Sequence, residues 1–148
     1  MAEVFIRGTV AHATFIEQRE GVVVLALPGT DYRLHLTCEV ALHPGVGGRV
    51  HGVIAAQARR VDIVRSGGAF IEPVYGRPRR IQGRVVAADS QANTITVNTG
   101  ACPITATLMP SQQARDFADG TFVGFDIEPG ASFVSEHEGA GIGDQGSG

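Results

Sequence analysis

The sequence contains no lysine and no tryptophan, and it has no long hydrophobic run. Its longest apolar stretch, residues 22–27, is far shorter than the ~20 residues that a membrane helix needs. The first residues, Met-Ala-Glu-Val-Phe-Ile-Arg, lack the apolar segment of a signal peptide. We therefore expect a cytoplasmic protein with no membrane partner, in which Cys38 and Cys102 are free thiols rather than a disulfide.

Recognisable catalytic and metal-binding motifs are missing as well. The sequence has no Gly-x-Ser-x-Gly, His-Glu-x-x-His or phosphate-loop pattern. His35 and Cys38 are three residues apart on a predicted strand, so their side chains point to opposite faces and do not share a metal ion. Asp126 and Glu128 share one strand face, which is more typical of a solvated surface than of an acid–base pair. We expect no catalytic residues, no metal site, no cofactor and no enzymatic activity.

The chain does contain an internal similarity between its first and second halves. Three short segments recur in the same order and at nearly the same separation: residues 7–10 and 82–85, residues 22–25 and 94–97, and residues 48–53 and 120–125. The last pair shares the pattern Gly-x-[Val/Phe]-x-Gly-[Val/Phe]. This similarity predicts two copies of one small β unit.

Local patterns predict strands through most of the chain. Within residues 32–38, Leu34 and Leu36 lie on one face and His35 on the other, an alternation that indicates a half-buried strand. The apolar phase of residues 49–64 shifts by an odd number of positions, which predicts a bulge or bend near Arg59.

Two further local predictions concern a turn and a helix. Ser66-Gly67-Gly68 is a turn signal that predicts a hairpin between residues 61–64 and 69–74. Residues 111–117 are predicted to form the one short helix of the second half, with Ser111 as its N-cap.

These patterns predict an all-β fold of two tandem five-stranded OB-like barrels packed together, with at most one short helix per repeat. The predicted units are a first barrel at residues 1–75, a linker at 76–80 and a second barrel at 81–135. Residues 136–148 are rich in glycine and acidic residues and are predicted to be a disordered tail. The alternative architecture is a single fused β-sandwich.

Several of these segments resemble TOBE-type units, which are OB-like barrels of molybdate-binding proteins and some transporter ATPases. The resemblance rests on Arg7-Gly8-Thr9-Val10, on the Val-Val-Leu-Ala-Leu-Pro-Gly segment, and on residues 48–55, Gly-Arg-Val-His-Gly-Val-Ile-Ala. The second copy, residues 82–85 through 120–125, is similar. The resemblance implies oxyanion binding at subunit interfaces, although Ala56, Gln57 and Ala58 stand where it implies serine and lysine residues.

Charge is distributed unevenly along the chain. Residues 59–84 carry seven arginines against two acidic residues, whereas residues 85–148 carry one arginine against eight acidic residues. The arginines, with two aromatic residues among them, form a candidate anion- and nucleic-acid-binding surface that we call the Arg belt. Its members are Arg59, Arg60, Arg65, Arg77, Arg79, Arg80 and Arg84, together with Tyr75 and Phe70.

The Arg belt supports more than one functional hypothesis. Guanidinium groups and aromatic rings together suit single-stranded nucleic acid, so the first hypothesis is a non-catalytic binding or adaptor module for an anionic partner. The second is a self-assembling structural protein in which the Arg belt meets the acidic half of a neighbouring copy, giving a homo-oligomer. The third, small-oxyanion binding, is implied by the family resemblance alone.

Overall fold

A computed structural model describes residues 8–42 and 45–136. The first strands are β1 (Ala11–Arg19), β2 (Val22–Ala26), β3 (Arg33–Thr37) and β4 (Arg49–Gln57). β1, β2 and β3 form an antiparallel meander, and β1 also pairs with β4. The side chains of this meander alternate as the sequence predicts, because Leu34 and Leu36 are buried while His35 is only half-buried.

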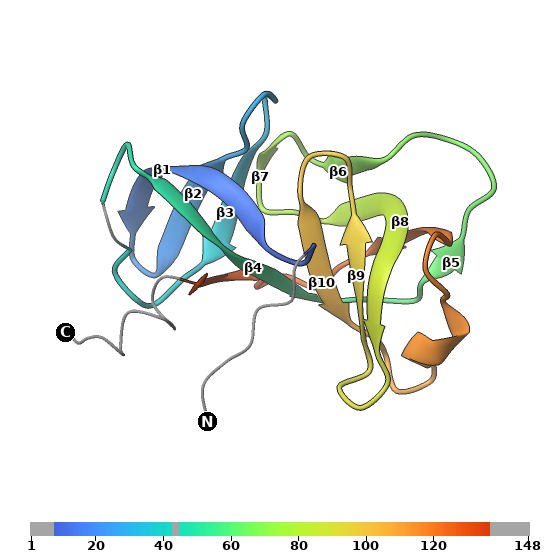
Figure 1. Ribbon diagram of the computed structural model, residues 1–148. Coiled ribbons are helices and arrows are strands. Elements are labelled where there is room, and N and C mark those ends of the chain that lie inside the picture. The colour runs from blue at the N-terminus through green and yellow to red at the C-terminus, as the bar shows by residue number, and fades with distance from the viewer. Residues whose placement is uncertain (1–7, 43–44, 137–148) are drawn as a thin grey trace.

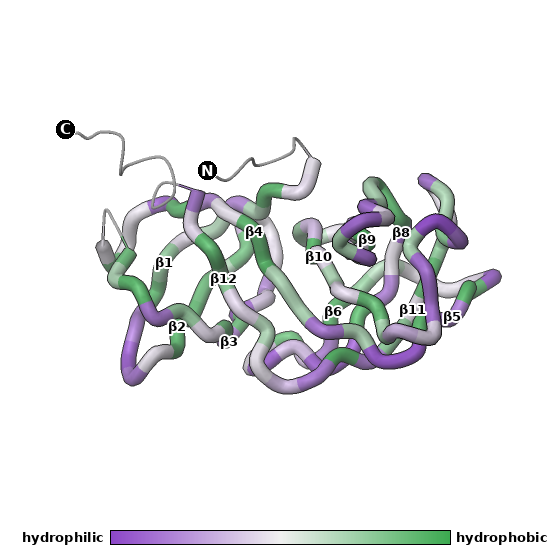
Figure 2. Tube along the Cα trace, turned by 90° about the horizontal axis from the view of Figure 1, so that it is seen from below, coloured by the Kyte–Doolittle hydropathy of each residue, from purple (hydrophilic) through white to green (hydrophobic). Residues whose placement is uncertain are grey.

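A strand from the far end of the chain closes the barrel. β12 (Ser132–Ser135) lies between β3, to which it is parallel, and β4, to which it is antiparallel. The strands β1, β2, β3, β12 and β4 therefore form a closed five-stranded barrel (Figures 1 and 2). This result confirms the all-β, small-barrel class. The closed barrel combines strands from the predicted units 1–75 and 81–135, and that division of the chain stays a prediction.

A second group of strands lies beside the barrel. β8 (Arg80–Asp89), β9 (Thr94–Asn98) and β10 (Pro103–Thr107) form an antiparallel meander, and β11 (Phe122–Asp126) pairs with the other edge of β8. The end of β4 continues into this group and runs parallel to β10. β4 thus belongs to both parts of the molecule (Figure 1).

Two long segments run antiparallel, side by side, from one part of the molecule to the other. β4 pairs with β12, Ala58 then forms an isolated antiparallel bridge with Ile127, and β5 (Asp62–Ile63) pairs with β11. Each segment begins in one group of strands and ends in the other. Each segment is interrupted between the two parts of the molecule, one between β4 and β5 and the other between β11 and β12. The first interruption agrees with the predicted bend near Arg59.

The predicted hairpin around residues 66–68 is wrong. β5 pairs with β11, whereas β6 (Phe70–Glu72) pairs with β8, so the two segments flanking the turn have different partners. Residues 62–63 and 70–72 therefore pair with two different strands of the second group and not with each other. Within the predicted linker at 76–80, Gly76 ends β7 (Tyr75–Gly76), which pairs with β3, and Arg80 begins β8.

The predicted helix at residues 111–117 is a single 3₁₀ turn, η1 (Ala114–Asp116). Gln113, and not Ser111, occupies the N-cap position, and its side chain makes no capping hydrogen bond. The Ala114 amide instead donates to Oδ1 of Asn93 at 2.8 Å. Because a side chain from another loop supplies this acceptor, local sequence could not identify the cap.

The core runs through both groups of strands and contains side chains such as Leu25, Ile54 and Phe125, which are almost fully buried. Gly52 lies where backbones approach closely, because a Cβ atom there would be 2.1 Å from the carbonyl oxygen of Val134 on β12. Residues 8–42 and 45–136 contain no helix long and apolar enough to cross a membrane. The predicted tail at 136–148 lies outside the described residues except for Glu136, whose carboxylate is 2.9 Å from His51.

Candidate nucleic-acid interface

Two arginines of the Arg belt are paired with the acidic second half of the same chain. Arg59, just after β4, places Nε and Nη2 each 3.2 Å from the Glu128 carboxylate, and Arg80 on β8 places Nη1 3.1 Å from Asp126. β11 pairs with β8 so that Asp126 lies opposite Arg80. All four side chains are at least one third exposed, so each pair contributes little to stability. The carboxylates of Glu128 and Asp126 nevertheless occupy part of the hydrogen-bonding capacity of these two guanidinium groups.

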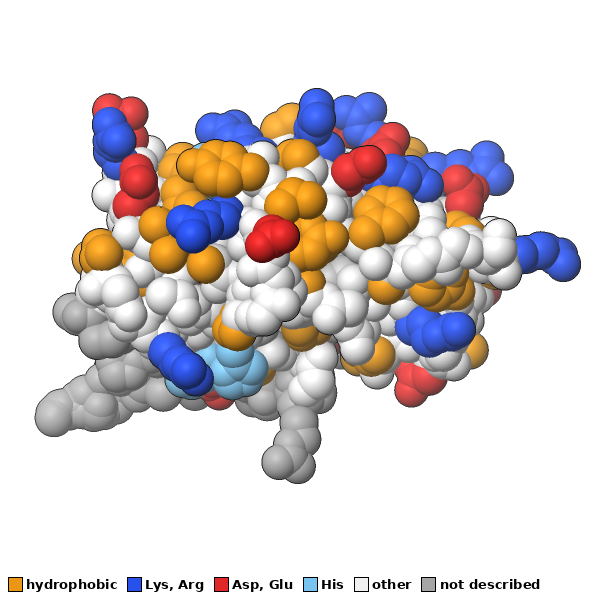
Figure 3. All heavy atoms as spheres, turned by 90° about the horizontal axis from the view of Figure 1, so that it is seen from above, with side chains coloured by type: hydrophobic (Ala, Val, Ile, Leu, Met, Phe, Trp, Pro, Cys, Tyr) orange, Lys and Arg blue, Asp and Glu red, His pale blue; other side chains and the backbone are white. Residues whose placement is uncertain are grey.

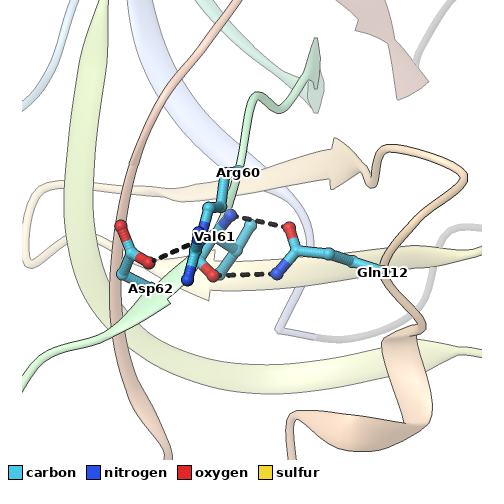
Figure 4. A network of polar contacts seen from close by, with 4 residues as sticks. All are labelled: Arg60, Val61, Asp62 and Gln112. Atoms are coloured by element: carbon cyan, nitrogen blue, oxygen red, sulfur yellow. Dashed lines mark hydrogen bonds and ion pairs between the residues drawn. The ribbon is translucent and has the colours of Figure 1, made fainter.

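Arg60 is also engaged within the chain. Its Nε lies 3.1 Å from Oδ1 of Asp62, on the other side of Val61 (Figure 4). Gln112 fixes the backbone between them, because its side-chain amide accepts from the Val61 amide at 2.7 Å and donates to the Val61 carbonyl at 2.9 Å. The side chain thus replaces a neighbouring strand at the break between β4 and β5.

Arg84 and Phe70 lie on the outer face of the β6–β8–β11 sheet. The guanidinium of Arg84 is 5.2 Å from the centre of the Phe122 ring and donates to the Gly120 carbonyl at 2.9 Å. Phe70 is half-buried opposite Gln82. The arginine therefore already covers one aromatic ring of this face.

The other three arginines of the belt differ from these four. Arg65, Arg77 and Arg79 are exposed, and their guanidinium groups make no hydrogen bond or ion pair with any residue that the structure describes. On the face seen from above, basic side chains surround a group of hydrophobic side chains, with acidic side chains among them (Figure 3). The structure thus divides the Arg belt into four engaged guanidinium groups and three that have no partner among the described residues.

Tyr75 has an aromatic and basic environment that the sequence analysis missed. β7 places Tyr75 beside Arg33 of β3, and the Tyr75 ring meets the His35 ring edge-on with 5.0 Å between ring centres. Tyr75 is 66% exposed, and Arg33 is exposed without a side-chain partner among the described residues. Arg33 and His35 are two residues apart on β3 and share one face, and β7 adds Tyr75 to that face through a pairing that local sequence does not reveal.

Chemically reactive groups are few in the described part of the chain. Burial raises the pKa of the Cys102 thiol to about 12, against which a hydrogen bond with Thr99 acts. The thiol is therefore protonated and unreactive at neutral pH. Cys38 is also buried, and its Sγ donates to the Val40 carbonyl oxygen at 3.3 Å. Residues 8–42 and 45–136 contain no group of three or more His, Cys, Asp or Glu side chains placed to hold a metal ion.

The strand order and closure define the chain as an all-β protein with a small closed barrel, consistent with an OB-like barrel. No family model, curated protein or solved structure matches it. The resemblance to TOBE-type units stays a prediction.

Proposed function

We propose that this protein is a non-catalytic binding module that contacts an anionic partner, with single-stranded nucleic acid as the ligand. The observation that carries the proposal is the division of the Arg belt. Arg65, Arg77 and Arg79 are exposed and free of partners among the described residues, although acidic side chains occupy Arg59, Arg60 and Arg80. The free groups can bind an external anion without first losing an internal ion pair.

The exposed ring of Tyr75 favours single-stranded nucleic acid over a simple anion. Sequence-tolerant binding of single strands combines a basic surface, which follows the phosphates, with aromatic rings on which bases stack. Arg77 is only two residues from Tyr75, and Arg79 follows on the approach to β8. In a duplex the paired bases stack on one another, so no base would be free to stack on the Tyr75 ring.

The architecture that we propose is a pair of related OB-like units that exchange their last strands. β2 and β9 fall on the second pair of similar segments, and β4 and β11 on the third. The pairing of β12 with β4 also has a counterpart in the pairing of β5 with β11. Such an arrangement would place the Arg belt across the junction of the two units.

Light scattering after size-exclusion chromatography, with the 260/280 nm absorbance ratio of the same peak, tests the proposal. We expect a protein that carries nucleic acid at low salt and releases it at high salt, because phosphate contacts release counterions. The double variant Arg65→Gln/Arg79→Gln should bind less and show a salt slope reduced by about two. The control Arg59→Gln/Arg60→Gln removes the same charge from occupied groups. An equal loss of nucleic-acid affinity in both double variants would mean that binding depends on net charge and not on the unpaired arginines, which would contradict the proposal.

Self-assembly is the second candidate, and the exchanged strand favours it. β12 completes a barrel that otherwise consists of strands from the first half of the chain, and the same pairing made between two copies would give a domain-swapped dimer. A nucleic-acid-free oligomer whose mass rises with protein concentration would favour this candidate over nucleic-acid binding.

A further inference from the structure

His35 contains an unusual buried atom. Its Nε2 has no hydrogen-bond partner among the described residues, although it is shielded from solvent. A ring nitrogen of this kind loses its hydrogen bonds to water on folding, so a missing partner disfavours the folded state. A water molecule or an ion is one common partner of such a buried polar atom in a native fold.

A small hollow lies beside this histidine. Its volume is about 10 Å³, and its lining includes His35, Thr37, Arg77 and the Gly130–Ala131 segment that leads into β12. This volume accommodates one oxygen-sized atom. No acidic residue is present among the described residues that line it. The local charge and the hydrogen-bonding groups therefore suit an oxygen of an anion.

The groups around the hollow suit two parts of one nucleotide. Tyr75 reaches His35 edge-on, with 5.0 Å between ring centres, and keeps most of its surface exposed. Arg77 lines the hollow, while Arg33 lies opposite Tyr75 in the strand register. Both guanidinium groups lack partners among the described residues. A base can thus stack on Tyr75 while its phosphate lies between the two arginines.

We propose that this place is a nucleotide subsite, in which one phosphate oxygen of a single strand enters the hollow and accepts a hydrogen bond from the Nε2–H group of His35, while Arg77 and Arg33 bind the same phosphate and Tyr75 stacks on the base. The inference rests on the proposed function, because it names the place on the surface where a single strand is held. It differs from that function in requiring β3 and β7, and not Arg65 or Arg79.

Fluorescence anisotropy with a labelled oligothymidylate of about 15 nucleotides tests the subsite. Tyr75→Leu should weaken binding about 10-fold, because it removes one stacked base. Arg77→Gln should weaken binding and lower the salt slope by about one, because one phosphate contact is lost. His35→Leu should weaken binding with little change in the salt slope. His35→Gln, which keeps a hydrogen-bonding group, should weaken it less than His35→Leu.

One control variant removes an arginine elsewhere. Arg115→Gln removes an exposed arginine of η1. It should bind the oligonucleotide as the wild type does. Thermal melting of every variant identifies any loss of affinity that is caused by unfolding. Tyr75 and Arg77 are exposed, so their variants keep the test valid if His35→Leu fails to fold.

The outcomes separate the subsite from the proposed function. If the wild type binds the oligonucleotide and Tyr75→Leu, Arg77→Gln and His35→Leu bind equally well, the subsite is overturned, the hollow holds only water, and the proposed function stands. Failure of the wild type to bind overturns both. If inorganic phosphate stabilises the wild type but not Arg77→Gln, and the oligonucleotide does not bind, the hollow takes a free anion and the nucleotide subsite is again overturned.

Discussion

Gly52 provides the sharpest test of the contact between β4 and β12. A Cβ atom at this position would lie 2.1 Å from the Val134 carbonyl oxygen and 2.8 Å from the Ser135 Cα atom. Both atoms belong to backbone, which cannot rotate out of the way as a side chain can. Gly52→Ala must therefore push β12 away from β4 at the point where β12 closes the barrel.

Two effects of opposite sign determine the size of the change. Overpacking of this kind costs about 3 kcal/mol, at the upper end of the usual range because the neighbouring atoms are backbone. Replacing glycine by alanine also reduces the entropy of the unfolded chain, which returns ~1 kcal/mol. The expected net loss is ~2 kcal/mol, and for a chain of this length this lowers Tm by about 4–8 °C.

Thermal and urea unfolding followed by circular dichroism measure this loss. Gly68→Ala is the matched control, because a Cβ atom at Gly68 meets no atom within 4 Å, so that only the entropy of the unfolded chain changes and stability should rise by ~1 kcal/mol or less. The reasoning is refuted if Gly52→Ala melts within 1 °C or so of Gly68→Ala. That result would mean that β12 does not lie against β4.

Two further predictions concern the barrel core and the thiols. Phe133→Ala should cost about 3–5 kcal/mol in urea unfolding, because Phe133 is buried on β12, whereas its exposed neighbour Val134 should tolerate alanine; equal effects would contradict the placement of β12. Cys102 should resist iodoacetamide at neutral pH in the folded protein and react after unfolding, because burial raises its pKa to about 12; mass spectrometry that finds rapid labelling of the native protein would contradict this.

Local patterns predicted the individual strands well and their partners poorly. The alternation around Leu34 and the phase shift near Arg59 depend only on neighbours within a few residues. Both features can therefore be predicted from the local sequence. The separation of β5 from β6 depends on β11 and β8, which lie far along the chain. A turn signal such as Ser66-Gly67-Gly68 indicates a change of direction but not the strand that follows.

The same limit applies to the candidate site. The sequence showed that seven arginines are concentrated in residues 59–84, but it could not tell which of them are free. Arg80 is paired because β11 brings Asp126 opposite to it. Arg33 lies outside the Arg belt in the sequence and reaches Tyr75 only through the pairing of β7 with β3. Spatial proximity across strands determined both outcomes.

The position of β12 between β3 and β4 has a consequence for synthesis on the ribosome. β1, β2, β3 and β4 leave the ribosome first, but their barrel cannot close until residues 132–135 have been made. During that interval the edges of β3 and β4 lack the strand that lies between them in the finished barrel, and open edges of this kind promote pairing with other chains. The edges of β3 and β4 in the nascent chain are therefore open to such pairing until residues 132–135 emerge.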